Sequence, residues 1–218
     1  MSKHKQTKRT YNSTRRKEQA RQTRLQILES ARAMFVERGY DGATLDAIAS
    51  EAGVAVDTLY AIFGSKRGIL SGLIEVSLVG DDEQTPLLER EGPRSVIREK
   101  DPLRQINLFA NDITTIMGRM APLFSIMRAA AKTEPDIEKM LREMLDSRLQ
   151  GMMVFVDALN TNHSLNSGVT REEAAETVWM LTSAEMHNLA MMDLGWSEEK
   201  YKKWLAAALV NLLLPHGN

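Results

Sequence analysis

Residues 44–63, which read TLDAIASEAGVAVDTLYAIF, decide the fold of this chain. Apolar side chains in the first part of this stretch recur at helical spacing, and Gly53 is well placed to end a short helix. A second short helix follows, with Leu59, Ile62 and Phe63 on its inner face. Two short amphipathic helices joined by a glycine turn are typical of a helix-turn-helix, although other helical hairpins share this pattern.

Helical patterns continue outward from this motif, and no stretch has the alternation of a strand. Asp101-Pro102 is a strong helix start, and Thr170 with Glu173 forms a capping box. We therefore predict an all-α fold of about nine helices, with a three-helix head that contains the motif and a C-terminal helical bundle. Besides the motif, helices are expected near 15–38, 66–79, 102–117, 119–132, 134–159, 170–194 and 197–214, with a linker over 80–100.

Charge is distributed unevenly along the chain. The first 24 residues hold nine Lys and Arg against Glu18 alone, a net charge of +8, so the remaining 194 residues carry −9. A positive end on an acidic body suits contact with a polyanion at that end, although a solvated leader has the same composition. We predict a basic flexible arm over 1–20, a helix-turn-helix domain over 21–81 and a C-terminal domain over 82–218.

Composition argues against several classes of protein. The chain has no cysteine, which excludes disulfides, thiolate zinc sites and cysteine nucleophiles. Its four histidines are scattered, and it has no GxSxG, HExxH or glycine-rich phosphate loop, so we expect no enzyme, metal site or cofactor. No apolar stretch is long enough to cross a bilayer, and no secretory signal is evident. We expect a cytoplasmic protein that makes no contact with membranes.

The second helix of a helix-turn-helix enters the major groove of DNA, while the first crosses the backbone. Here Asp57, Thr58 and Tyr60 give the second helix a polar outer face, and a basic segment stands just upstream. These features favour double-stranded DNA as the partner. Two such helices in a symmetric pair would read a palindromic site if they lay roughly 34–36 Å apart.

The stretch from Arg24 to Leu70 resembles the DNA-binding domain of the TetR family of transcriptional regulators. The resemblance rests on ILESARAMFVERGYDGATLDAIASEAGV over 27–54, TLY over 58–60, Phe63, Ser65 and Lys66. The ending GWSEEKYKKWLAAALVNLLLP, over 195–215, is similar to the closing helices of many members. The resemblance implies a homodimer paired through the helices near 170–194 and 197–214. It also implies regulation, usually repression, that responds to an unknown small-molecule effector.

The family pattern further implies phosphate contacts from Thr44, Tyr60 and Lys66. Thr44 begins a helix, where its hydroxyl and the free backbone amides can meet a phosphate together. Tyr60 offers a phenolic donor, and Lys66 adds its charge at the start of the next helix. The alternative is that Thr44 only caps its helix and that Tyr60 only packs on the core.

Several residues of the second motif helix depart from the family pattern. Many members have serine where this chain has Ala55, and Asp57 could cap the helix instead. Ala55 and Val56 can meet a thymine methyl group, whereas Asp57 could accept a hydrogen bond from cytosine. With Thr58, these are the candidate base-reading residues. Ile62 replaces an aromatic donor, which indicates one phosphate contact fewer.

The basic arm can compensate for the small number of base contacts that we expect from this helix. Arg15 and Arg16 are the candidates to enter a narrow minor groove, whose negative potential attracts arginine. Each phosphate that the arm neutralises would steepen the salt dependence of binding by about 0.9.

The C-terminal part has the composition of a ligand-sensing domain. Eleven of the 13 methionines lie after residue 100, and methionine fills irregular apolar space, although an ordinary helical core has the same appearance. The candidate pocket residues are Phe124, Met127, Met144, Trp179 and His187, with His187 as the polar group. A ligand that favours another spacing of the two heads would weaken DNA binding.

Two other functions fit the same residues. One is a DNA-binding regulator without a small-molecule effector. The other is a ligand-binding helical protein whose head has lost its affinity for DNA, because Ala55, Asp57 and Ile62 depart from the family pattern.

Overall fold

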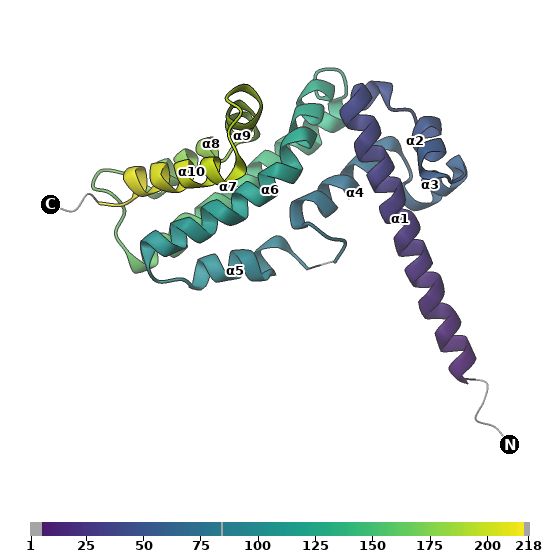
Figure 1. Cartoon of the computed structure of the whole chain (residues 1–218), viewed down its shortest axis with the longest axis horizontal. Coiled ribbons are helices and arrows are strands. Elements are labelled where there is room, and N and C mark those ends of the chain that lie inside the picture. Colours follow the sequence, from purple (N-terminus) through teal and green to yellow (C-terminus); the bar gives the residue numbers. More distant parts are fainter. Residues whose placement is uncertain (1–5, 84, 216–218) are drawn as a thin grey trace. The chain divides into compact units, whose positions relative to one another are not determined.

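The computed structural model describes residues 6–83 and 85–215, with side chains from Arg15 onward (Figure 1). The described residues contain helices and no strand, which confirms the predicted all-α class. Their contacts divide the chain into two compact units, Met1–Glu75 and Val76–Asn218.

The N-terminal unit comprises α1 (Gln6–Gly42), α2 (Leu45–Ala52), α3 (Val56–Phe63) and most of α4 (Lys66–Val79). The apolar stripes of these helices face one another, because each helix can remove only one face from water. The resulting core contains the fully buried side chains of Ile27, Phe35, Ile48, Leu59, Ile69 and Leu70.

Helix α1 is longer than the sequence predicted. It begins at Gln6, whereas the apolar periodicity predicts a start at Arg15. The basic segment lacks an apolar stripe, but it is rich in Lys, Arg and Gln, which have high intrinsic helix propensity. The expected flexible arm over 1–20 is therefore helical from residue 6 onward, and its first five residues lie outside the described part. Near the other end, Gly39 has φ +70° and interrupts the helix as predicted, but the chain resumes helical form up to Gly42.

The C-terminal unit is arranged around one long central helix. Its elements are η1 (Leu87–Glu89), α5 (Glu91–Arg98), α6 (Pro102–Ala130), α7 (Pro135–Asn162), α8 (Arg171–Leu181), α9 (Ala184–Asn188), the π-helical turn η2 (Leu189–Asp193) and α10 (Glu198–Leu213). Helix α6 contacts α5, α7, α9 and α10 (Figure 1). Its apolar residues Ile106, Met120, Leu123 and Met127 are fully buried.

The predicted helix starts of this unit are confirmed. The Asp101 carboxylate accepts a hydrogen bond of 2.7 Å from the Arg104 amide, and Pro102 occupies the first turn of α6. Thr170 and Glu173 form the complete capping box at the start of α8. The Ser197 hydroxyl caps α10 by accepting a hydrogen bond of 3.2 Å from the Lys200 amide. These local signals fix the helix starts because each side chain satisfies an amide that the helix leaves free.

Two boundary predictions in the first half of this unit were wrong. The expected linker over 80–100 contains η1 and α5, and burial of Val96 holds α5 in the unit. The two helices expected at 102–117 and 119–132 are one helix, α6, which passes through Gly118 and Pro122. Buried residues on both sides of Gly118 outweigh its low helix propensity, since packing overrides local preference.

The helix expected over 170–194 is interrupted. Helix α8 ends at Leu181, and the Ser183 hydroxyl then caps α9 by accepting a hydrogen bond of 3.2 Å from the Met186 amide. The Thr182 hydroxyl bonds back to the Val178 carbonyl at 2.7 Å, a competition that weakens a continuing helix. The π-helical turn follows α9, and Gly195, with φ +62°, stands before the last helix.

Candidate nucleic-acid interface

The two helices of the motif are held by local caps. The Thr44 hydroxyl accepts a hydrogen bond of 3.1 Å from the Ala47 amide at the start of α2. Gly53 takes the left-handed conformation, φ +63°, that ends α2, and its amide bonds back to α2 carbonyls. Leu59 of α3 is 1% exposed and anchors α3 against the core. The predicted helix-turn-helix is therefore formed over the predicted residues.

The opposite face of α3 is open to solvent. Tyr60 is 53% exposed, and Ala55 and Asp57 are also exposed, while Val56 and Thr58 are half-buried. These five residues thus lie in α3 or at its N-cap, with at least part of each side chain at the surface. An α-helix of this kind matches the width of the major groove.

Two expectations for α3 need correction. Asp57 does not cap the helix: Ala55 occupies the cap position without a side-chain hydrogen bond, and Asp57 lies inside the first turn. There its charge is favourable, because the N-terminal end of a helix dipole is positive. Ile62, expected on the inner face, is 38% exposed, since Leu59 fills the contact with the core.

Lys66 and Thr44 stand at two helix starts of this unit, but their side chains are engaged differently. Thr44 is exposed and accessible from solvent. The Lys66 ammonium donates a hydrogen bond of 2.8 Å to the Tyr40 carbonyl and lies 4.3 Å from the centroid of the Tyr40 ring. Lys66 therefore ties α4 to the end of α1, and any phosphate contact would share its ammonium with this internal bond.

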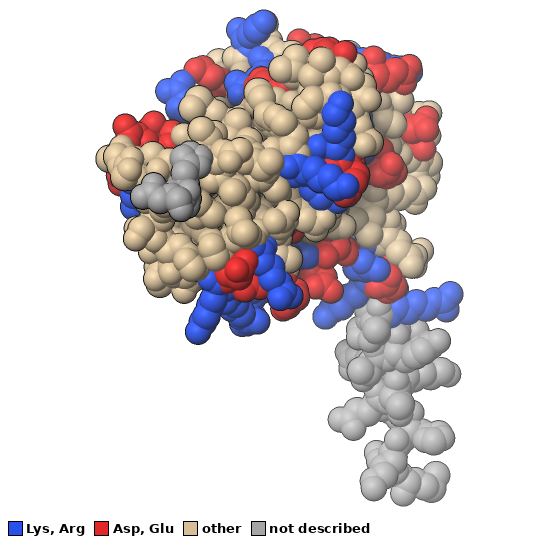
Figure 2. Space-filling model, turned by 60° about the vertical axis from the view of Figure 1, so that its left-hand side comes forward, with Lys and Arg blue, Asp and Glu red and all other residues tan. Residues whose placement is uncertain are grey.

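The basic residues Arg15 and Arg16 are exposed on the helical backbone of α1. A helix is about 10–12 Å wide with its side chains, and the minor groove is only about 6 Å wide. A helical segment thus favours contact along the phosphates over insertion of an extended arm. On the face drawn in Figure 2, basic and acidic side chains are intermingled, with uncharged surface between them.

A model of the family described as bacterial regulatory proteins, tetR family, matches residues 27–73, which hold the whole helix-turn-helix. Over nearly the full chain the sequence is similar to the HTH-type transcriptional repressor BepR of Brucella suis, with 26% identity over 207 residues, 94% of this chain and 90% of BepR. The chain belongs to the TetR family. It is a DNA-binding transcriptional regulator of that family.

Other transcriptional regulators share parts of the sequence or the fold. The HTH-type transcriptional repressor KstR of Mycobacterium tuberculosis is 28% identical over 135 residues, 58% of each chain. The structure of FadR from Bacillus subtilis in complex with stearoyl-CoA matches with a TM-score of 0.68 and 18% identity, over 85% of this chain and 97% of FadR. NalD, the secondary repressor of the MexAB-OprM multidrug efflux pump in Pseudomonas aeruginosa, matches with a TM-score of 0.66 and 18% identity, over 90% of this chain and 98% of NalD. At this identity the two structures establish the shared fold.

Neither a metal centre nor a membrane span is found among the described residues. Within that part of the chain, no three His, Asp or Glu side chains are grouped as metal ligands would be. None of the helices described is both long and apolar enough to cross a membrane.

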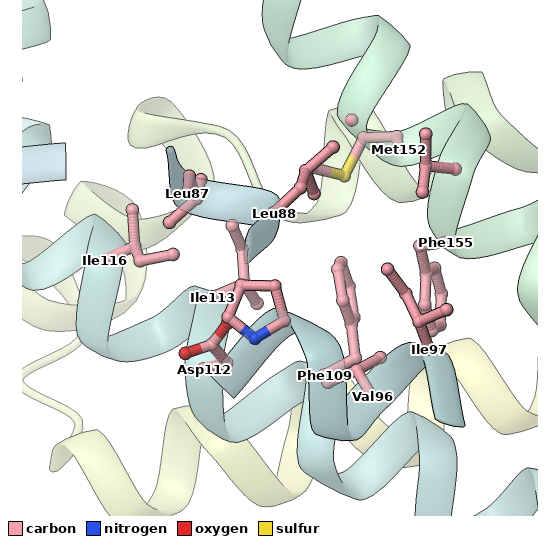
Figure 3. Close-up of a pocket in the computed structure, with 13 residues that line it drawn as sticks. Leu87, Leu88, Val96, Ile97, Phe109, Asp112, Ile113, Ile116, Met152 and Phe155 are labelled. Atoms are coloured by element: carbon pink, nitrogen blue, oxygen red, sulfur yellow. The ribbon is translucent and has the colours of Figure 1, made fainter. Parts of the chain in front are cut away.

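The C-terminal unit of this TetR-family chain contains an apolar cavity of about 80 Å³ between η1, α5, α6 and α7 (Figure 3). One wall is formed by Phe109 and Phe155, whose rings stack with their centroids 3.8 Å apart. Leu88 of η1 and Ile97 of α5 also line the cavity. Among the thirteen described residues that line the cavity, Asp112 is the only one with a charged or polar side chain.

None of the five predicted pocket residues lines this cavity. Met127 is fully buried in the core, Met144 is half-buried on α7, and Phe124 lines a separate, more open hollow beside α9. Residues of η1 and α5 form part of the cavity lining, and the composition of these two elements is typical of a linker. The signal that could have revealed α5 is the apolar pair Val96-Ile97 at the end of the expected linker.

The other two predicted residues, Trp179 and His187, belong to a buried polar cluster. Arg148 donates hydrogen bonds to the Trp179 carbonyl at 2.7 Å and the Thr182 hydroxyl at 2.6 Å, and its guanidinium lies 5.0 Å from the Trp179 ring centroid. Burial lowers the pKa of Arg148 to about 10, and burial also lowers the pKa of His187. His187 packs edge-to-face on Tyr201, at 5.5 Å between centroids. This cluster joins α7, α8, α9 and α10.

Two arginines of the C-terminal unit bind the end of α4 and the segment that follows it. Arg119 of α6 donates hydrogen bonds to the carbonyls of Ser77, at 2.7 Å, and Leu78, at 3.3 Å. Arg90, next to α5, forms a bidentate pair with Asp81, at 2.6 and 2.7 Å. Hydrogen bonding to Arg90 lowers the pKa of Asp81 to about 2. These contacts could not be predicted from the sequence.

Proposed function

We propose that this TetR-family regulator is a homodimeric repressor that binds a palindromic operator and leaves it when a small-molecule effector enters the C-terminal unit. The observation that carries the proposal is the exposed face of α3, which presents Tyr60, Asp57 and Ala55 while Leu59 anchors the helix from behind. The residues of this face contribute little to the core, so packing within the unit leaves their side chains accessible to DNA.

Pairing through the C-terminal helices is supported by the apolar side chains that they leave in solvent. Met192 is 78% exposed, and Met180, Leu189, Leu194 and Leu212 are between 46% and 57% exposed. Exposed apolar residues gathered on a few neighbouring elements mark interaction surfaces. A two-fold pair would use the same surface on both chains, and it would set the distance between the two α3 helices.

Effector release is supported by the route from the cavity to α4. Helix α5 and η1 form walls of the cavity, and Arg90 next to them holds the segment after α4. The boundary between the two units falls within α4, after Glu75, so a shift of its last turn acts on the helix that leads into the DNA-binding unit. A ligand that binds one state better than the other shifts the equilibrium toward that state.

Repression is supported by the relatives, since BepR, KstR and NalD are all named as repressors. The test is a mobility-shift titration of the protein on the promoter DNA of its own and neighbouring genes, with random duplex as competitor. Tyr60→Phe should weaken binding about 2- to 10-fold, because a phenolic hydrogen bond contributes about 0.5–1.5 kcal/mol.

The matched control for Tyr60→Phe is Tyr40→Phe, because Tyr40 is buried and lies outside α3. Failure of the wild-type protein to prefer any promoter fragment over random duplex would contradict the proposal. In that case a ligand-binding protein without DNA affinity becomes the better interpretation.

A further inference from the structure

The side chains that line the cavity are almost all apolar. Twelve of its thirteen lining residues offer only apolar side chains or glycine, and the thirteenth is Asp112. In Figure 3 the Asp112 side chain projects from α6 among Ile113, Ile116 and the residues of α5. None of the residues that line the cavity is basic, so a bound molecule would meet one acidic group and apolar walls.

The Asp112 carboxylate is half-buried and accepts no hydrogen bond from another described residue. It lies against the backbone of α5, where a Cβ added to Gly92 would be 2.7 Å from its Oδ1 atom. Burial raises the pKa of Asp112, while the charge of Arg119 lowers it. The Arg119 guanidinium donates hydrogen bonds to the carbonyls at the end of α4, and it acts on Asp112 through its charge. A half-buried carboxylate of this kind gains from a charged donor.

We propose that the cavity binds a slender lipophilic amine, with its alkyl chain between the walls of α5, α6 and α7 and its ammonium group on the Asp112 carboxylate. This proposal rests on the proposed function in one respect, namely that the cavity is the effector site. The volume of about 80 Å³ is well below the roughly 300–1,000 Å³ of pockets for drug-sized ligands, which favours a single unbranched chain.

The same observations argue against an anionic ligand. A carboxylate or phosphate in this cavity would stand near Asp112 without a basic partner among the lining residues, and like charges in a low-dielectric site repel each other strongly. FadR was solved with stearoyl-CoA, whose head group is anionic. The present cavity lacks the complementary charge for such a group, so we expect the two proteins to differ in ligand.

The experiment is a calorimetric titration of the full-length protein at neutral pH with n-hexylamine, 1-hexanol and hexanoate, three probes that share one chain and differ in head group. We expect n-hexylamine to bind about tenfold more tightly than 1-hexanol, and hexanoate to bind most weakly, because a hydrogen bond between two charged groups is stronger than one from a neutral hydroxyl. Equal or tighter binding of hexanoate would overturn the proposal.

The variant Asp112→Asn keeps the shape of the side chain and removes its charge. It should lose the tenfold preference for n-hexylamine over 1-hexanol. Asp146→Asn is the matched control, since Asp146 is exposed on α7 and does not line the cavity. Unchanged n-hexylamine binding in Asp112→Asn, with its helical circular dichroism preserved, would also overturn the proposal.

These titrations contain no DNA, so the two proposals fail separately. If n-hexylamine binds through Asp112 but does not release DNA, the ligand class stands and effector release by this site fails. If none of the three probes binds while the protein still selects an operator, the ligand class fails and DNA binding stands.

Discussion

The Arg119 side chain donates a hydrogen bond of 2.7 Å from Nε to the carbonyl of Ser77, 42 residues earlier in the chain. A second bond, from Nη2, reaches the Leu78 carbonyl. Helix carbonyls at a C-terminal end have no partner within the helix and carry partial negative charge, so a guanidinium satisfies them and stabilises the helix end. The last turn of α4 is therefore set by a residue of α6, the same helix that carries Asp112.

Replacement of Arg119 should loosen this helix end. We expect Arg119→Met to lower the free energy of unfolding by about 1.5–3 kcal/mol, because two carbonyls lose a charged donor. Arg119→Lys should lose less, since it retains the charge but not the planar pair of donors. Urea unfolding followed by circular dichroism measures both. Equal stability of wild type and Arg119→Met would show that the contact does not hold α4.

Thr44 has two separable roles in this account, a cap and a phosphate contact. Thr44→Ala should lower the free energy of unfolding by about 1 kcal/mol, since the Ala47 amide loses its acceptor. It should also weaken DNA binding. Thr44→Ser retains the hydroxyl and should preserve both properties. If Thr44→Ala unfolds more easily but binds DNA as tightly as wild type, Thr44 is only a cap.

The basic start of α1 should be visible in the salt dependence of DNA binding. Deletion of residues 2–16 removes Arg15, Arg16 and the basic residues before them. The slope of log affinity against log salt should become shallower by about 0.9 for each phosphate contact that is lost. Fluorescence anisotropy at several salt concentrations gives this slope. An unchanged affinity and slope would rule out DNA contact by this segment.

Stability should depend on the protonation of His187. Burial lowers the pKa of His187 below its usual value of 6.5, so the unfolded chain binds a proton that the folded chain resists. The contribution of this histidine is complete above pH 6.5 and is lost as the pH falls toward the lowered value. We expect urea stability to decrease between pH 7.5 and 5.5, and to decrease less in His187→Asn. An identical decrease in both proteins would contradict this assignment.

Features set by short segments could be predicted from the sequence. The helix-turn-helix over 44–63 and the starts of α6, α8 and α10 depend on caps and turns a few residues long, so they were predicted correctly. Helix α5 was missed because its glycine, proline and charges are typical of a linker, while its stability comes from burial of Val96. The continuity of α6 through Gly118 likewise depends on packing rather than on propensity.

The DNA-binding face could be predicted from the sequence, whereas the cavity could not. The outer face of α3 follows from helical spacing, so its residues could be named in advance. The cavity is formed by residues far apart in the sequence, such as Leu88, Phe109 and Phe155, and periodicity does not tell which buried faces leave space between them. Similarly, Arg119 gains its role only where the fold brings it to the carbonyl of Ser77.

Recognition of a palindromic operator by a dimer can be measured by selection of binding sites from a pool of random DNA duplexes with the purified full-length protein. We expect enrichment of one palindromic sequence, with half-sites about one helical turn apart and two or more protein chains on each duplex. Recovery of no preferred sequence, or of an asymmetric site bound by a single chain, would contradict it.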